Sequence, residues 1–148
     1  MFGKSGKYKK ISDLVGTEIH RQVRQALEKK EQLFDNPEQA AFMAAYLKLF
    51  MFEPFSSLGV RDYGTITKYT KRVCDGVIPG RMWEIYEQGN ALNDLAQDGT
   101  NKKQKKLVEV YNLGEEAGTH DGAEFFRENI QPENLYNYLI GKKVKLWD

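Results

Sequence analysis

The apolar run from Ala40 to Phe55 constrains the fold of this chain more than any other feature. It reads AAFMAAYLKLFMFEPF, and Lys48 is the only charge inside it before Glu53 and Pro54. A membrane-spanning helix needs about 20 apolar residues, whereas a run of about 10–14 is typical of a buried core helix. Because the run closes early, it predicts a helix at the centre of the fold and no transmembrane segment.

The residues before the run mark where this helix begins. Asn36 is a good N-cap, and Pro37 suits the first helical turn. We therefore expect the central, nearly all-apolar helix over about residues 37–52. At about 100° per residue, its alanines fall on one side and its bulky apolar residues on the other.

Small residues on a helix surface let a second helix approach closely. The alanine side of the central helix is one such strip, and a second runs from Gly114 to Gly118. Each strip seats either a neighbouring helix of the same chain or a second chain. The candidate interface residues are Ala41, Ala44, Ala45, Lys48, Gly114 and Gly118.

The rest of the chain has helical periodicity and contains no repeat and no interdomain linker. We expect an all-α single domain, a bundle of six or seven helices, over residues 11–141. Residues 1–10 are expected to form a flexible basic tail. Residues 142–148 are expected to form a C-terminal tail, anchored on a neighbouring surface by Val144, Leu146 and Trp147.

Two glycines predict a break late in the chain. Gly118 and Gly122 flank His120, and glycine is unfavourable inside a helix. We therefore expect one helix over about residues 102–117 and a short new helix over about residues 119–129.

Charge and cysteine content limit the classes of function. The chain has 22 basic and 21 acidic residues, a net charge of +1, so it has no global attraction to nucleic acid or to an anionic membrane. Cys74 is the only cysteine, which excludes an intramolecular disulfide and a cysteine-based metal site. No apolar signal-peptide segment follows the basic N-terminus. A cytoplasmic protein is expected.

Few residues are arranged for catalysis or metal binding. Glu116, His120 and Glu124 recur at four-residue spacing, which places them on one face of a continuous helix, and they are the candidates for a metal site. Helical di-iron sites, however, use Glu-x-x-His pairs that the chain lacks. Cys74 ends an apolar helical pattern, as a core residue does. We assign no catalytic residue, no metal and no cofactor.

The segment over residues 58–81 contains three short motifs. Their order is Leu58-Gly59-Val60, then Thr65-Ile66, then Gly76-Val77-Ile78-Pro79. This order resembles the helix-turn-helix of small DNA-binding regulators, whose second helix lies in the major groove. The resemblance implies that basic residues of the segment contact phosphates or base edges. These residues are Arg61, Lys68, Lys71, Arg72 and Arg81.

A second basic cluster, KKQKK, spans Lys102 to Lys106 at an expected helix N-terminus. Positive charge opposes the helix dipole there, at a cost of roughly a few tenths of a kcal/mol per charge. Binding an acidic partner is one function that would offset this cost.

The sequence predicts most directly a non-enzymatic helical protein that acts by protein–protein interaction or self-association. A homodimer through one of the small-residue strips is a specific form of that hypothesis. DNA binding through residues 58–81 is the alternative, and an acidic partner would use the same basic residues. A metal- or small-molecule-dependent enzyme is the second alternative.

Overall fold

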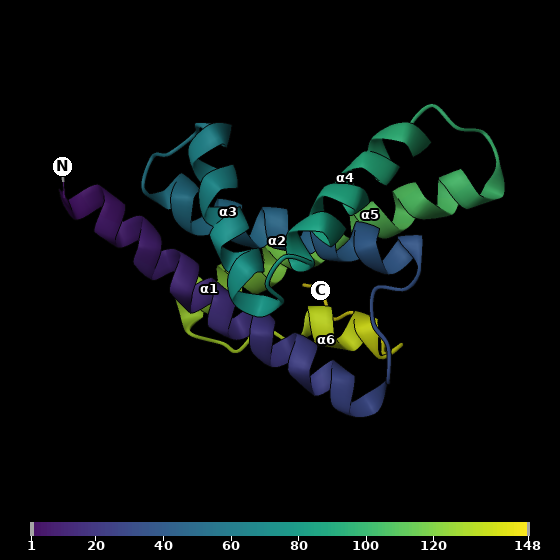
Figure 1. Ribbon diagram of the computed structural model, residues 1–148, viewed down its shortest axis with the longest axis horizontal. Helices are drawn as coiled ribbons and strands as arrows, with labels where there is room; N and C mark the ends of the chain where they lie inside the picture. Colours follow the sequence, from purple (N-terminus) through teal and green to yellow (C-terminus); the bar gives the residue numbers. More distant parts are fainter. Residues whose placement is uncertain (1, 148) are drawn as a thin grey trace.

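The computed structural model describes residues 2–147 and contains six helices and no strand within that range (Figure 1). They are α1 (Phe2–Lys29), α2 (Pro37–Ser57), α3 (Tyr63–Val77), α4 (Met82–Ala96), α5 (Lys102–Glu128) and α6 (Asn134–Leu139). Figure 1 shows α2 in the middle, α1 along one side, and the α4–α5 hairpin projecting on the other. The predicted all-α bundle is confirmed.

α2 begins where the sequence predicts. The Asn36 side chain accepts a hydrogen bond from the Gln39 amide at 2.8 Å, and Pro37 occupies the first turn. Between residues 39 and 55, only Lys48 and Phe52 are exposed. The rest of the chain therefore encloses α2, and each large apolar side chain buried in this way contributes about 1.5–3 kcal/mol.

α2 continues one turn beyond its predicted end, to Ser57. Pro54 lies inside this turn, although proline disfavours a helical residue before it. Pro54 and Phe55 are buried, and the Leu58 amide bonds to the Pro54 carbonyl at 3.3 Å. Core packing therefore stabilises a last helical turn at a place where Glu53 and Pro54 predict the end of the helix. Neither α2 nor another helix in residues 2–147 combines the length and apolarity needed to cross a membrane.

α5 is continuous, so the predicted break at Gly118 and Gly122 is wrong. With Gly114, these glycines recur every four residues and form a stripe that faces α2. A Cβ atom on Gly118 would lie 2.9 Å from the Cα of Tyr46, and one on Gly114 would lie 2.6 Å from the Phe42 carbonyl oxygen. The glycines thus let two helix backbones touch rather than ending a helix.

The same register continues one turn further, where a Cβ on Gly122 would lie 3.3 Å from the Cα of Phe50. Residue numbers rise by four on both helices at each step, so α2 and α5 run parallel. The aromatic side chains of the three α2 residues follow one another, with the Tyr46 and Phe50 ring centroids 5.7 Å apart.

The alanine side of α2 is also used inside the chain. A Cβ on Gly89 of α4 would lie 2.8 Å from the Cβ of Ala44. The predicted strip residues on both helices are buried, and so they cannot present a surface to a second chain. These residues are Ala41, Ala44, Ala45, Gly114 and Gly118.

α1 begins at Phe2, so residues 2–10 continue the helix where a separate tail was expected. Tyr8 gives the reason, because its ring centroid lies 5.2 Å from that of Phe55 and 5.5 Å from that of Tyr69. α1 ends at Lys29, and Phe34 in the connection to α2 adopts a left-handed φ of 62°. Met1 and Asp148, the outermost residues of the two predicted tails, lie outside the described residues.

We predict that Gly118→Ala lowers the free energy of unfolding by about 1–3 kcal/mol, because its methyl group would overlap the α2 backbone. Gly16→Ala is the matched control, since a Cβ on Gly16 in α1 meets no atom within 4 Å. That change should raise the free energy of unfolding by about 0.5–1 kcal/mol. Urea denaturation measures both variants, and equal effects would contradict the close packing of α5 on α2.

Candidate functional site

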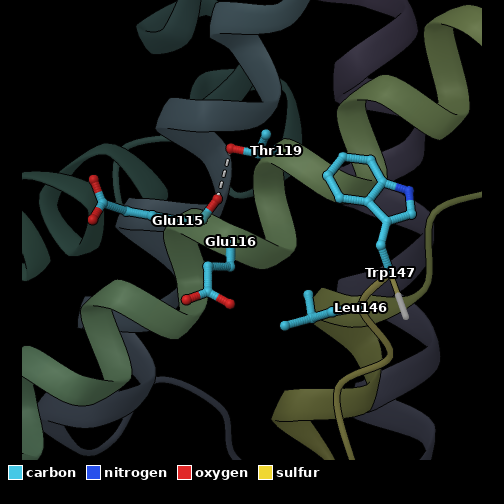
Figure 2. A pocket seen from close by; sticks show the side chains of 5 residues that line it. All are labelled: Glu115, Glu116, Thr119, Leu146 and Trp147. Carbon is cyan, nitrogen blue, oxygen red and sulfur yellow. Dashed lines mark hydrogen bonds between the residues drawn. The ribbon is translucent and has the colours of Figure 1, made fainter.

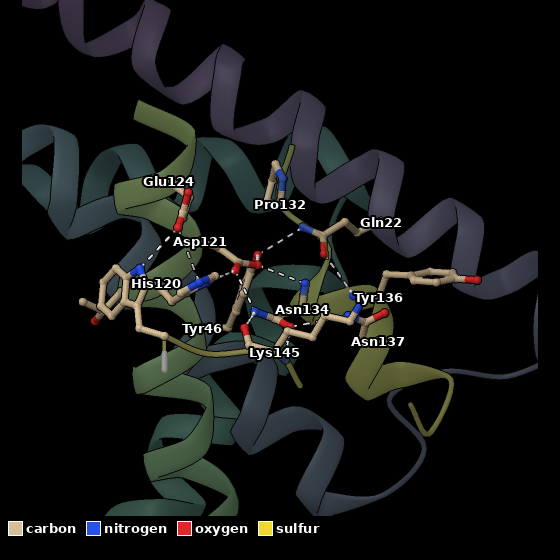
Figure 3. Close-up of polar contacts among 12 residues, drawn as sticks. Gln22, Tyr46, His120, Asp121, Glu124, Pro132, Asn134, Tyr136, Asn137 and Lys145 are labelled. Carbon is tan, nitrogen blue, oxygen red and sulfur yellow. Dashed lines mark hydrogen bonds and ion pairs between the residues drawn. The ribbon is translucent and has the colours of Figure 1, made fainter. Parts of the chain in front are cut away.

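A buried carboxylate, Asp121 of α5, accepts four hydrogen bonds (Figure 3). Its Oδ1 accepts from Nδ1–H of His120 at 2.8 Å and from the Asn134 side-chain amide at 2.7 Å. Its Oδ2 accepts from the Tyr46 hydroxyl at 2.5 Å and from the Asn134 backbone N–H at 3.0 Å. An ionised carboxylate has about four acceptor positions, so Asp121 is satisfied by protein groups alone.

Gln22 of α1 is fully buried and extends this network. Its side-chain N–H donates to the Tyr46 hydroxyl oxygen at 3.2 Å, and its side-chain oxygen accepts from the Tyr136 backbone N–H at 3.0 Å. Burial, and then the negative charge of Asp121, raise the pKa of Tyr46 well above its usual value, so the phenol remains a donor. One polar network thus joins α1, α2, α5 and α6 inside an apolar core.

The network also holds the C-terminal tail. The Asn134 side chain makes two hydrogen bonds of 2.7 Å with the backbone of Lys145. The indole N–H of Trp147 donates to Glu124 at 3.2 Å, and its ring lies edge-on to His120 with centroids 4.9 Å apart. Up to Trp147, the tail therefore docks on the rest of the chain, as predicted.

Between the tail and α5 lies an open groove of about 480 Å³ (Figure 2). We call it the tail groove, and its lining residues are Glu115, Glu116, Thr119, Leu146 and Trp147. Figure 2 shows Glu116 on the α5 side and the apolar side chains of Leu146 and Trp147 on the tail side. The lining holds two carboxylates and no basic residue, so it suits a cation with an apolar stem.

His120 is oriented by contacts with three neighbouring side chains. Asp121 fixes its Nδ1–H, as a carboxylate does beside a catalytic histidine. The other ring nitrogen lies 3.7 Å from Glu124, and Trp147 packs on the ring. Among the hydrogen bonds of residues 2–147, none joins His120 to a hydroxyl or thiol that it could activate.

The structure brings together only part of the predicted metal set. His120 and Glu124 are neighbours, whereas Glu116 lines the tail groove. Over the described range, no group of three or more His, Cys, Asp or Glu side chains is placed to hold a metal ion.

The five predicted basic residues are all exposed, but only three gather on one surface. Lys68, Lys71 and Arg72 line a groove of about 730 Å³ between α3 and the first half of α1, which we call the α1–α3 groove. Arg61 lies in the loop before α3, and Arg81 lines a separate hollow at the start of α4.

The α1–α3 groove has mixed charge, which a uniform phosphate backbone does not match. Lys9 adds a cation to its lining, but Asp13 and Asp75 also line it. Arg72 is paired with Asp13 at 3.4 Å. The helix before the turn, α2, is enclosed by the bundle and cannot lie across a DNA backbone in the way that the resemblance implies.

Lys48 is the one charged residue of the alanine side of α2, and it reaches water. It lines a hollow of about 290 Å³ together with Phe52, Tyr63 and Glu115. A gap in the packing around α2 thus lets the ammonium group stay solvated while the rest of the helix is buried.

Sequence reasoning missed the network around Asp121. Two signals were present: Gln22 lies beside the apolar positions Ile19 and Val23 of the same helix, and Asp121 directly precedes Gly122, which meets α2. A polar residue at a buried position needs partners, but their identity depends on how distant helices pack.

No family model matches the chain, and no curated protein or solved structure is significantly similar to it.

We predict that Asp121→Asn lowers the free energy of unfolding by about 1–3 kcal/mol, because the new amide would face donors that need an acceptor. The Lys145 amide should exchange with solvent faster, since Asn134 holds it. Asp13→Asn, which breaks only an exposed ion pair, should cost less than about 1 kcal/mol. Equal losses in the two variants would contradict the role of Asp121.

Cys74 is buried, and burial raises the pKa of its thiol from 9.0 to about 12. We predict that a disulfide reagent does not modify it at pH 8 in the native protein and modifies it rapidly in urea. Because the folded-state pKa is the higher one, the thiol contributes stability below pH 9 that is lost as the pH rises toward 12. Rapid reaction of the native protein at pH 8 would contradict the burial of this thiol.

Proposed function

We propose that the protein is a non-catalytic binding protein, and that the tail groove receives a basic side chain of a protein partner. The observation that carries this proposal is the exposed indole of Trp147, fixed opposite Glu116 in a groove with no basic residue. The single buried thiol fits a cytoplasmic setting for this function.

The groove matches both parts of a lysine or arginine side chain. The apolar stem would pack on Leu146 and Trp147, and the charged end would approach Glu116. A cation over an indole face contributes about 0.5–2 kcal/mol. Tryptophan and arginine are also the residues that contribute most often to binding energy at protein interfaces.

The indole is held before any partner arrives. Glu124 accepts its N–H at 3.2 Å, and His120, itself bonded to Asp121, supports its edge. A partner therefore does not have to order this side chain, which lowers the entropic cost of binding. The polar network is thus a support for a binding surface, and not a catalytic relay.

Fluorescence of Trp147 tests the proposal in a Trp83→Phe background, where it is the only tryptophan. A pentaarginine amide should change the Trp147 emission, and Glu116→Gln should weaken its binding about three- to tenfold. Glu109→Gln removes an exposed carboxylate of the same helix outside the groove and should leave binding unchanged. An unchanged emission, or an equal effect of both variants, would contradict the proposal.

An electrophoretic retardation experiment with duplex DNA separates this proposal from the DNA-binding alternative. Duplex DNA at low salt should not be retarded, because the tail groove is acidic and the α1–α3 groove is mixed. Retardation that Lys68→Glu abolishes would favour the DNA-binding alternative.

A further inference from the structure

An apolar groove lies where the α4–α5 hairpin meets the start of α2. We call it the hairpin groove; its volume is about 570 Å³, and Pro37, Leu92 and Leu107 form much of its wall. Leu95 lines the same groove with 76% of its surface exposed, more than any other large apolar residue between 5 and 147. Exposed apolar surface gathered in one place marks a contact surface.

Two opposite charges line the same groove. Glu38 comes from the first turn of α2, and Lys103 comes from the first turn of α5. Within residues 2–147, no ion pair joins them to each other. Lys103 opposes the dipole of α5, so a carboxylate brought close to it from outside would be stabilising.

We propose that a second copy of the chain covers the hairpin groove, related to the first by a twofold axis. Such an axis brings the same patch of both copies together. The patch carries both a protruding leucine and an apolar groove, so Leu95 of each copy enters the groove of the other. It also carries both charges, so Glu38 of each copy faces Lys103 of the other.

Self-complementarity is what selects a second copy over other occupants. A partner surface with charges of a single sign would form an ion pair with only Glu38 or only Lys103. A second copy pairs with both residues, and the twofold axis makes two such sets of ion pairs. The C-terminal tail is not free to cover the groove, because Lys145 and Trp147 are fixed on α5 and α6. The hairpin groove shares no residue with the tail groove, so dimer formation does not depend on the proposed binding of basic side chains.

Sedimentation velocity over a range of concentrations tests the proposal with the full chain. The wild-type protein should form a dimer, and Leu95→Asp should raise its dissociation constant at least about a hundredfold, because two leucines per dimer lose their apolar contact. Leu14→Asp is the control, since Leu14 is 44% exposed on α1, away from the groove. Circular dichroism should show both variants folded.

Charge-reversal variants of Glu38 and Lys103 test whether these two residues pair across the twofold axis. Glu38→Lys and Lys103→Glu should each weaken the homodimer, because each places two like-charged pairs across the axis. An equimolar mixture of the two variants should form a dimer again, since every pair in the mixed dimer is then opposite in charge. A monomeric wild-type protein, a dimer that survives Leu95→Asp, or a mixture that stays monomeric would each overturn the proposal. Loss of peptide binding in the tail groove would contradict the proposed function but not the proposed dimer, because the two grooves share no residue.

Discussion

The direct contact between the backbones of α2 and α5 determines the rest of the fold. Helices normally pack with their axes 8–10 Å apart because side chains separate them, and glycine at the contact removes that separation. Gly114, Gly118 and Gly122 of α5 contact the backbone of α2. Their positions therefore set the register between α2 and α5. α4 follows from the same arrangement, since its Gly89 meets the alanine side of α2.

The register has a chemical consequence at Asp121. Because Gly118 and Gly122 meet Tyr46 and Phe50, Asp121, which directly precedes Gly122, is placed beside the Tyr46 hydroxyl inside the core. A carboxylate there is costly unless it is fully hydrogen-bonded. α6 and the tail provide those bonds through Asn134, and the tail in turn carries Trp147 to the surface. A packing constraint in the core thereby determines the shape of the tail groove.

Local sequence signals predicted what depends on local structure. The all-helical class, the Asn36 cap and the central position of the apolar helix follow from periodicity, capping and hydropathy. Predictions failed where tertiary packing overrides a local preference. Gly118 and Gly122 were interpreted as helix breakers, yet a partner helix makes a backbone without side chains favourable at these positions.

The binding surfaces could be predicted less well than the fold. The tail was expected to dock through Leu146 and Trp147, but the carboxylates opposite it come from α5, about thirty residues earlier, and only the packed bundle brings them together. The basic residues between 58 and 81 illustrate the same limit. Helical spacing groups Lys68, Lys71 and Arg72, but nothing local predicts that Asp13 of α1 would neutralise Arg72.

Nuclear Overhauser effects between backbone protons of α2 and α5 test the central claim most directly. The packing predicts strong cross-peaks between the Hα protons of Gly118 and the Hα of Tyr46, together with contacts of Gly114 to Phe42 and of Gly122 to Phe50. Cross-peaks in this parallel register would support the account. Their absence, or a pattern shifted along either helix, would contradict it, because the position of Asp121 and the tail groove both depend on that register.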